Sequence, residues 1–130
     1  MGQPKSRILV VEDEAAIRDG LADVLVYHGY EVDAVGDGRV GLQKALSGRY
    51  DLLLLDVMLP DGDGFDILAS LRSHPGHALL PIVMLTVKDD PNDIRRGLTL
   101  GADGYVTKPY SKKLLADTLR QVLKLALPAS

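Results

Sequence analysis

The 130-residue chain contains no cysteine and no tryptophan. Without thiols it forms no disulfide, no cysteine-ligated metal site and no thiol nucleophile. No apolar run approaches the roughly 18 residues of a membrane-spanning helix, and the amino terminus lacks the apolar core of a signal peptide. The net charge of −3 gives no sign of general nucleic-acid binding. We therefore expect a cytoplasmic protein with no membrane partner and no direct contact with nucleic acid.

Length and composition suit one domain. The chain is 46% hydrophobic and 25% charged, which allows a sizeable core. We expect a flexible leader over residues 1–5, one domain over 6–126, and a tail or the start of a linker over 127–130. The opening residues MGQPKS also match a myristoylation pattern, but that pattern is short and easily met by chance.

Apolar runs and helical patterns alternate five times along the chain. Strands are predicted over residues 7–11, 31–35, 51–55, 81–85 and 104–107. Helices are predicted around 17–28 and over 38–47, 64–73, 91–100 and 111–126. Strands that alternate with helices favour a parallel sheet covered on both faces. The runs RILVV, DLLLL and PIVML lack polar alternation, as the central strands of such a sheet should.

Polar residues follow the predicted strands at their carboxyl ends, where open α/β sheets bind ligands. Glu12 and Asp13 follow the first strand, Asp56 the third, Thr86 the fourth and Lys108 the fifth. If the first and third strands are neighbours, three carboxylates converge and repel one another. Mg²⁺ is a good candidate to offset that charge, because it takes oxygen ligands. The lysine is a second source of positive charge.

This set of groups suits phosphoryl transfer. An aspartate can attack phosphorus and form an aspartyl phosphate, while a metal and a lysine neutralise the phosphoryl oxygens. Asp56 lies in the apolar stretch LLLLDVMLP and has no basic residue within six positions, which leaves its oxygen free to attack. Each residue alone has an ordinary explanation, such as the helix cap expected of Glu14. The inference rests on four strand ends that supply complementary groups.

The sequence resembles the receiver domain of two-component response regulators, including the chemotaxis regulators. The matching segments are ILVVEDE (8–14), LLLLDVMLPDGDGFDIL (52–68), PIVMLT (81–86) and GADGYVTKPY (101–110). They occur in the family's order and spacing, and the resemblance covers about residues 6–126. It implies a flavodoxin-like (βα)5 fold, doubly wound, with five parallel strands in the order 2-1-3-4-5 and helices on both faces.

The resemblance also implies a phosphoacceptor and a metal site. Asp56 matches the phosphoacceptor. Glu12 and Asp13 match the acidic pair that binds Mg²⁺ or Mn²⁺, with Asp13 the more direct ligand. Asp56 and the backbone carbonyl of Met58 would complete the protein's contribution to the metal.

Three further roles follow from the resemblance. Thr86 and Lys108 match the residues that contact the phosphoryl group. Thr86 and Tyr105 match the switch pair, in which the threonine moves toward the phosphoryl group and the aromatic ring turns inward. The Lys108–Pro109 peptide bond is expected to be cis, an isomer that is uncommon even before proline.

The implied function is a signalling switch that catalyses only its own phosphorylation and dephosphorylation. A sensor histidine kinase or a phosphotransfer protein would present a phosphohistidine to Asp56. The face formed by 91–100, 104–107 and 111–126 would then change its preference for a downstream target that the sequence does not identify. We expect a monomer or a weak, phosphorylation-dependent dimer.

Other interpretations stay open. GDGRVG (36–41) matches the dinucleotide-binding pattern, and Asp56 lies twenty positions after Gly36, although a lone match is weak. An aspartyl-phosphate hydrolase would need a second acid two positions after its nucleophile, where Met58 stands. A pseudo-receiver, an interaction module, would never take phosphate. His74 and His77 flank a Pro-Gly turn, but two loop histidines without further ligands make a poor zinc site.

Overall fold

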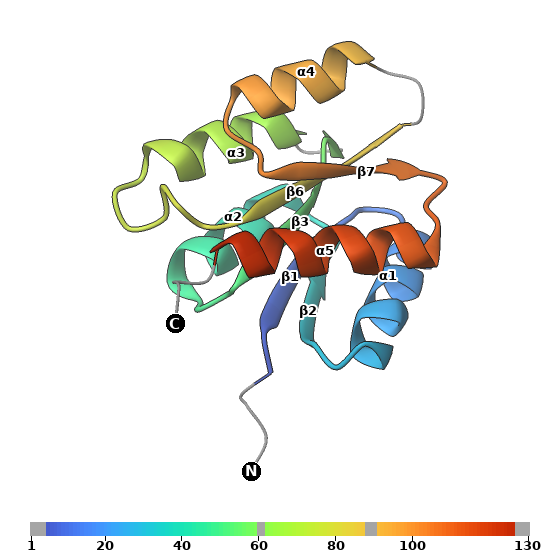
Figure 1. Ribbon diagram of the computed structural model, residues 1–130. Helices are drawn as coiled ribbons and strands as arrows, with labels where there is room; N and C mark the ends of the chain where they lie inside the picture. Colours follow the sequence, from blue (N-terminus) through green and yellow to red (C-terminus); the bar gives the residue numbers. More distant parts are fainter. Residues whose placement is uncertain (1–4, 60–61, 88–90, 127–130) are drawn as a thin grey trace.

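The computed structural model describes residues 5–59, 62–87 and 91–126 (Figure 1). Within the expected leader only Lys5 is described, and the expected tail over 127–130 lies outside the described residues. None of the described helices is long and apolar enough to cross a membrane.

Strands and helices alternate along the chain as expected from the sequence. The main sheet consists of β1 (Arg7–Val11), β2 (Glu31–Val35), β3 (Leu52–Asp56), β6 (Ile82–Val87) and β7 (Gly104–Lys108). The helices are α1 (Ala15–Tyr27), α2 (Gly38–Ser47), α3 (Gly64–Ser73), α4 (Pro91–Thr99) and α5 (Lys112–Ala126).

The strands of the main sheet lie in the order β2-β1-β3-β6-β7, and every neighbouring pair is parallel. This order is the predicted 2-1-3-4-5, so the predicted doubly wound fold is confirmed. It places β1 and β3 side by side at the centre, which brings the chain segments after them to one edge of the sheet. Strand β3 is shifted by one residue from its predicted range, so Asp56 is the last residue of the strand.

A short hairpin was not predicted. Strands β4 (Met58–Leu59) and β5 (Gly62–Asp63) pair antiparallel between β3 and α3. Two residues per strand are too few to produce a readable alternation of polar and apolar side chains.

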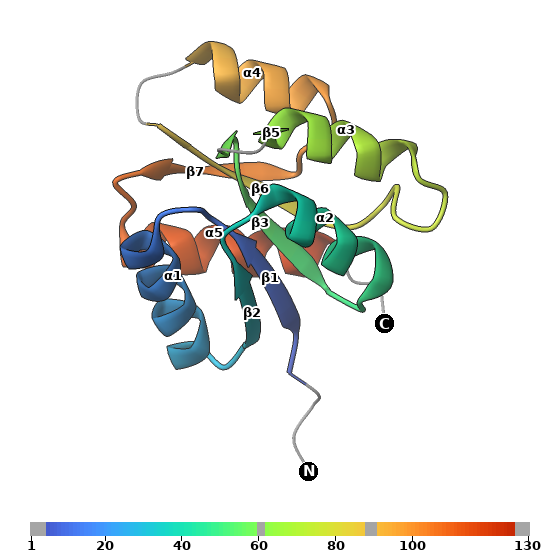
Figure 2. The same cartoon turned by 180° about the vertical axis from the view of Figure 1, so that it is seen from behind.

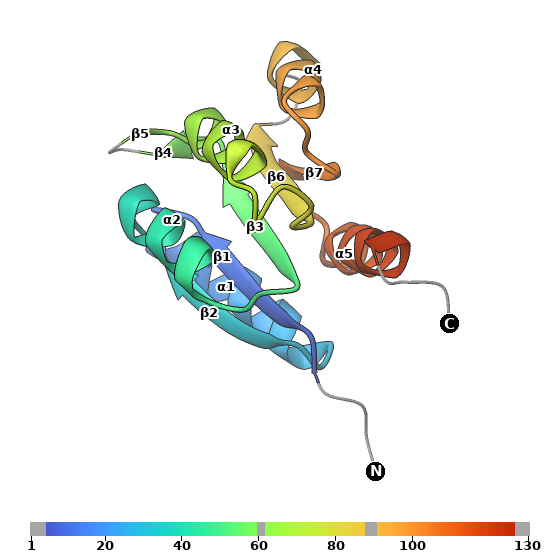
Figure 3. The ribbon, with the colours of Figure 1, turned by 90° about the vertical axis from the view of Figure 1, so that its left-hand side faces the viewer.

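The helices cover both faces of the sheet. Figure 1 shows α5 in front of the sheet, and Figure 2, from behind, shows α2 and α3 on the opposite side. The two layers of helices are seen edge-on in Figure 3. Along β3, Leu52 and Leu54 face the cluster packed by α1 and α5, whereas Leu53 and Leu55 face the cluster packed by α2 and α3. Each leucine is at most 1% exposed, and burying such a side chain contributes about 2 kcal/mol.

Two helix starts show opposite outcomes for acidic residues. Asp37 caps α2, because its Oδ1 accepts hydrogen bonds from the amides of Arg39 at 2.7 Å and Val40 at 3.1 Å. Such a cap is worth about 1 kcal/mol. Glu14 occupies the same position before α1 but makes no side-chain cap, so the expectation that it caps this helix is wrong. Its backbone amide instead donates to Glu12 Oε2 at 3.0 Å.

Candidate functional site

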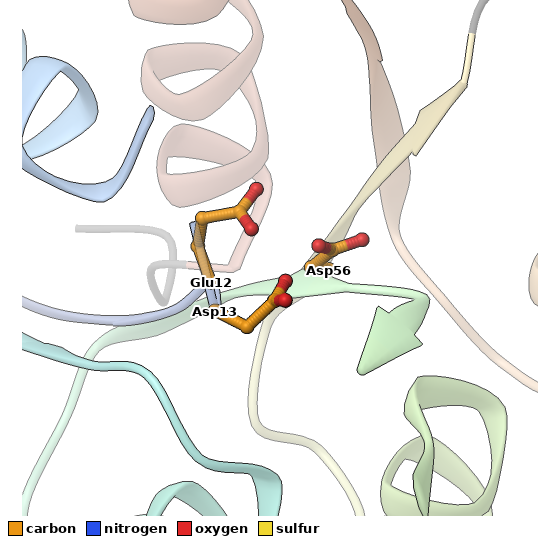
Figure 4. Close-up of side chains that lie close together, drawn as sticks. All are labelled: Glu12, Asp13 and Asp56. Atoms are coloured by element: carbon orange, nitrogen blue, oxygen red, sulfur yellow. The ribbon is translucent and has the colours of Figure 1, made fainter. Parts of the chain in front are cut away.

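Three carboxylates meet at the carboxyl ends of β1 and β3. Each of Glu12, Asp13 and Asp56 offers an oxygen that lies within 4.8 Å of the other two. Figure 4 shows the three side chains gathered between the end of β1 and the end of β3. The pairing of β1 with β3, from Ile8 with Leu52 to Val11 with Leu55, produces this convergence. The predicted acidic cluster is therefore formed, and it joins Glu12 and Asp13 to an aspartate 44 and 43 positions later in the sequence.

Two of the carboxylates are fully buried. Glu12 and Asp56 are 0% and 1% exposed, whereas Asp13 is exposed. A buried charge is costly unless it is paired. Asp56 Oδ1 accepts a hydrogen bond from the Met58 amide at 2.9 Å, and Oδ2 accepts one from Lys108 Nζ at 2.9 Å. The cation that the local sequence around Asp56 lacks is supplied 52 residues later.

Lys108 bridges the two buried acids. Its ammonium nitrogen lies 2.7 Å from Glu12 Oε1 and 2.9 Å from Asp56 Oδ2. The short contact with Glu12 is an ion pair without full hydrogen-bond geometry, since Oε1 has no hydrogen-bond partner by angle. Burial lowers the pKa of Lys108, but its close contacts with the negative charges of Glu12 and Asp56 outweigh it, so the pKa is raised above 10.5. The lysine therefore stays charged at neutral pH.

The end of β7 places this lysine at the site. Lys108 is the last residue of the strand and pairs in register with Val87 of β6. The peptide bond to Pro109 is cis, which is the isomer expected from the sequence.

Thr86 adds a buried hydroxyl at the same edge. The β3–β6 register pairs Asp56 with Leu85, so Thr86 follows directly on the neighbouring strand. Its side chain is 1% exposed, and its Oγ1 has no hydrogen-bond partner among the described residues. An unpaired buried hydroxyl costs about 1–3 kcal/mol, so this oxygen is suited to a ligand that supplies the missing bond.

Tyr105 and Met58, the other residues with predicted roles, are both exposed. Tyr105 is in β7, is 42% exposed, and lines a hollow with residues of α4, among them Ile94, Arg95 and Leu98. The Met58 side chain is 64% exposed and points away from the core. Its backbone amide donates to Asp56 at 2.9 Å, and the expected contact between its carbonyl and a metal stays a prediction.

One residue near the site was missed in the sequence. Arg18, in the first turns of α1, donates from Nη1 to the carbonyl oxygens of Glu12 at 3.0 Å and Asp13 at 3.3 Å. A basic residue near a helix amino terminus opposes the helix dipole. That unusual placement is the signal that could have identified it.

The remaining sequence motifs have structural explanations. In GDGRVG, Asp37 caps α2, and a Cβ on Gly41 would lie 2.7 Å from Val11 Cγ2, so this glycine lets α2 pack closely on β1. His74 and His77 place their Nδ1 atoms 3.2 Å apart in an exposed turn. Within the described residues, neither histidine belongs to a group of three potential metal ligands.

Comparison with known proteins agrees with this geometry. The chain matches the response regulator receiver domain family over residues 8–120. It is 45% identical over 120 residues to the transcriptional regulatory protein PcoR of Escherichia coli, covering 92% of this chain and 52% of PcoR. It is 43% identical over 124 residues to the probable transcriptional regulatory protein TcrX of Mycobacterium tuberculosis, covering 95% and 51%. The chain thus spans about half the length of the curated relatives it matches.

Solved structures show the same fold. A putative response regulator from Chloroflexus aurantiacus superposes with a TM-score of 0.90 at 32% identity, covering 93% of this chain and 99% of that chain. The chemotaxis response regulator CheY4 of Vibrio cholerae gives 0.86 at 34% identity, covering 92% and 99%. These comparisons confirm that the four sequence segments resemble those of response regulator receiver domains. The chain belongs to the response regulator receiver domain family, the phosphoacceptors of two-component signalling.

Proposed function

We propose that Asp56 is the phosphoacceptor and takes its phosphoryl group from a phosphohistidine of a sensor histidine kinase or phosphotransfer protein. This proposal rests on the surroundings of Asp56. Its carboxylate is buried at the end of β3, contacts Lys108 at 2.9 Å, and shares the sheet edge with the unpaired hydroxyl of Thr86. Family membership supports the same assignment.

The transfer exchanges one bond to phosphorus for another. A carboxylate oxygen of Asp56 forms the O–P bond while the P–N bond of the phosphohistidine breaks. The bonding electrons leave with the imidazole, which takes up a proton. Later attack by water on phosphorus restores the carboxylate and releases phosphate. The protein is therefore a switch that acts on its own aspartate rather than an enzyme for external substrates.

Lys108 and Thr86 would bind the transferred group. The lysine already contacts Asp56 Oδ2, so its ammonium can move with little displacement to a phosphoryl oxygen. The Thr86 hydroxyl can donate a hydrogen bond to another oxygen, which would satisfy its unused capacity. Donors aimed at charge that develops during the reaction are a principal source of rate enhancement.

The residues present also fit a divalent cation. Glu12, Asp13, Asp56 and the Met58 carbonyl would hold Mg²⁺ or Mn²⁺, because hard cations prefer carboxylate and carbonyl oxygens. Lys108 pairs with only two of the three carboxylates, so the cluster carries excess negative charge that a cation would offset. When bound, the metal would neutralise charge on the phosphoryl oxygens. Asp13 is the exposed member and has no ion pair among the described residues.

The switch would act on the face formed by α4, β7 and α5. Thr86 is on β6 and Tyr105 on the adjacent β7, paired with Met84. If Thr86 moves toward the phosphoryl group, space opens for the half-exposed Tyr105 ring to turn inward. That movement would alter the hollow beside α4 and the face's affinity for a downstream target. A cytoplasmic location, and a monomer or weak dimer, accompany this proposal.

The test is intact mass spectrometry after incubation with Mg²⁺ and acetyl phosphate. The parent should gain one phosphoryl group, and Asp56→Asn should gain none. Asp51→Asn is the matched control, since Asp51 precedes the same strand and accepts from the Arg7 amide at 2.7 Å. It should be phosphorylated like the parent.

Beryllofluoride binding, measured in parallel, covers the case of a short-lived acyl phosphate. A parent that takes neither phosphoryl nor beryllofluoride is a pseudo-receiver, and the proposal is then wrong. The GDGRVG segment would be tested against NAD next.

A further inference from the structure

We propose that Arg18 is a positioning residue for the metal site, because it holds the backbone that presents Glu12 and Asp13. This inference rests on the proposed function, in which these two side chains bind Mg²⁺. Among the described residues, the Arg18 guanidinium donates to backbone carbonyls and not to the Asp56 carboxylate. It would act through the loop between β1 and α1.

The contacts of Arg18 reach the backbone of both acidic residues. Nη1 donates to the carbonyl of Glu12 at 3.0 Å and to the carbonyl of Asp13 at 3.3 Å. The backbone hydrogen bonds between the sheet and this segment end at Glu12, whose amide donates to the Val35 carbonyl at 3.0 Å. The Asp13 side chain is exposed and has no ion pair among the described residues. The guanidinium therefore restrains the chain at the point where the more direct metal ligand projects.

Gly36 provides the space that Arg18 occupies. A Cβ built on Gly36 would lie 2.5 Å from Arg18 Nη1 and 3.3 Å from Cζ. Its other near neighbour is the Glu12 carbonyl oxygen, at an acceptable 3.7 Å. An alanine at position 36 would thus displace the flexible guanidinium while the surrounding backbone stays in place. This explains the first glycine of GDGRVG without a nucleotide.

Two possible roles of Arg18, as a nearby charge and as a positioning residue, predict opposite changes in Mg²⁺ affinity when the residue is removed. A cation near a Mg²⁺ site repels the metal, so if charge alone mattered, its removal would tighten Mg²⁺ binding. If Arg18 orders the loop, its removal weakens binding, because residues that orient metal ligands typically contribute 10- to 100-fold in affinity. The sign of the change therefore separates the two explanations.

The experiment measures the Mg²⁺ dissociation constant by calorimetry for the parent, Arg18→Ala, Arg18→Lys, Gly36→Ala and the double variant Arg18→Ala/Gly36→Ala. We expect Arg18→Ala to weaken binding about tenfold, and Gly36→Ala to do nearly the same. Lysine keeps the charge and one donor, so it should restore part of the affinity. The double variant should be no weaker than Arg18→Ala, since both changes remove one interaction.

Arg72→Ala is the matched control. Arg72 also donates to two backbone carbonyls, those of Gly101 at 2.9 Å and Leu80 at 2.7 Å, but at the opposite end of the sheet. It should lower the urea midpoint and leave the Mg²⁺ constant unchanged. Arg72→Lys serves the same purpose if the alanine variant does not fold.

Three results would overturn the inference. Arg18→Ala could bind Mg²⁺ as tightly as the parent or more tightly, the effects of Arg18→Ala and Gly36→Ala could add in full, or Arg72→Ala could weaken Mg²⁺ binding equally. A parent that itself binds no Mg²⁺ and takes no phosphoryl group would instead refute the proposed function on which the inference rests.

Discussion

At the carboxyl ends of the strands, two buried carboxylates share one ammonium group and a third carboxylate lies beside them, whereas toward the amino ends Arg7 and Arg72 each pair with an aspartate. The Glu12 and Asp56 side chains are 0% and 2% exposed, and both depend on Lys108. Arg7, the first residue of β1, pairs with Asp33 at 3.2 Å, and both side chains are about two-fifths exposed. The sheet thus buries an acidic pair at its carboxyl edge, whereas the Arg7–Asp33 pair near its amino edge stays in contact with water.

Hydrogen bonding differs in the same way. Toward the amino ends, Arg72 donates to the carbonyls of Gly101 and Leu80 and to Asp103, whose carboxylate also accepts from the Ile82 amide at 2.8 Å. Among the described residues, the buried side-chain oxygens without a hydrogen bond are Glu12 Oε1 and Thr86 Oγ1, and both lie at the carboxyl ends. Polar groups at the amino ends stabilise the fold. Those at the carboxyl ends retain capacity for a ligand.

The largest expected effect comes from removing the shared cation. Lys108→Met leaves two buried carboxylates unpaired, so the free energy of unfolding at pH 7 without Mg²⁺ should fall by about 3 kcal/mol. Added Mg²⁺ should recover part of this loss by replacing the positive charge. Urea unfolding with and without Mg²⁺ measures both. Arg7→Met, which breaks solvent-exposed pairs, should cost less than about 1 kcal/mol. Equal losses at the two ends would contradict the comparison.

Removing the charge of Asp13 is expected to raise the free energy of unfolding, whereas the preceding substitutions lower it. Asp13 contributes to the carboxylate cluster without an ion pair of its own among the described residues. Asp13→Asn should therefore raise the free energy of unfolding by about 0.5 kcal/mol without Mg²⁺, because like-charge repulsion is relieved. Asp33→Asn, which removes the negative charge that pairs with Arg7 and strengthens the hydrogen bond from the Tyr50 hydroxyl, should lower it. Two changes of the same sign would show that the ends do not differ electrostatically.

The smallest effect is a pH dependence near the amino ends. Burial, and then the hydrogen bond to Asp33 and its charge, raise the pKa of Tyr50 from 10.0 to about 12. The folded state favours the neutral phenol, so its contribution is complete below pH 10 and is lost as the pH rises from 10 to about 12. Solvent screening limits it to a few tenths of a kcal/mol.

Unfolding in urea at pH 9 and at pH 11 measures this contribution. The parent should lose slightly more stability over that interval than Tyr50→Phe, which has no phenol to ionise. The difference between the two proteins isolates Tyr50 from the other groups that titrate there. An identical loss of stability in both proteins would show that ionisation of Tyr50 does not contribute to the pH dependence.

The fold and the convergence of the site were predictable because periodicity and strand ends determine them. The buried run before Asp56 predicted a central strand, and the βα alternation predicted which residues share an edge. Burial within the acidic pair was not predictable. Glu12 and Asp13 are adjacent and chemically alike, and only the three-dimensional packing turns one inward to Lys108 and leaves the other exposed.

Contacts between side chain and backbone were the hardest to predict. Arg18 binds carbonyl oxygens, and every residue has a carbonyl, so sequence alone does not identify the acceptors. The same reason explains Glu14, where the amide, and not the expected side chain, makes the bond at the start of α1. Side-chain partners with complementary charges, such as Asp56 and Lys108, leave a clearer trace in the sequence.

The most direct test of the central claim locates the phosphoryl group. After phosphorylation with acetyl phosphate and Mg²⁺, borohydride reduces an aspartyl phosphate to homoserine, which peptide mass spectrometry assigns to a position. The account predicts homoserine at position 56 and an unchanged aspartate at positions 13 and 51. Homoserine at either of those two positions, with Asp56 unmodified, would contradict it.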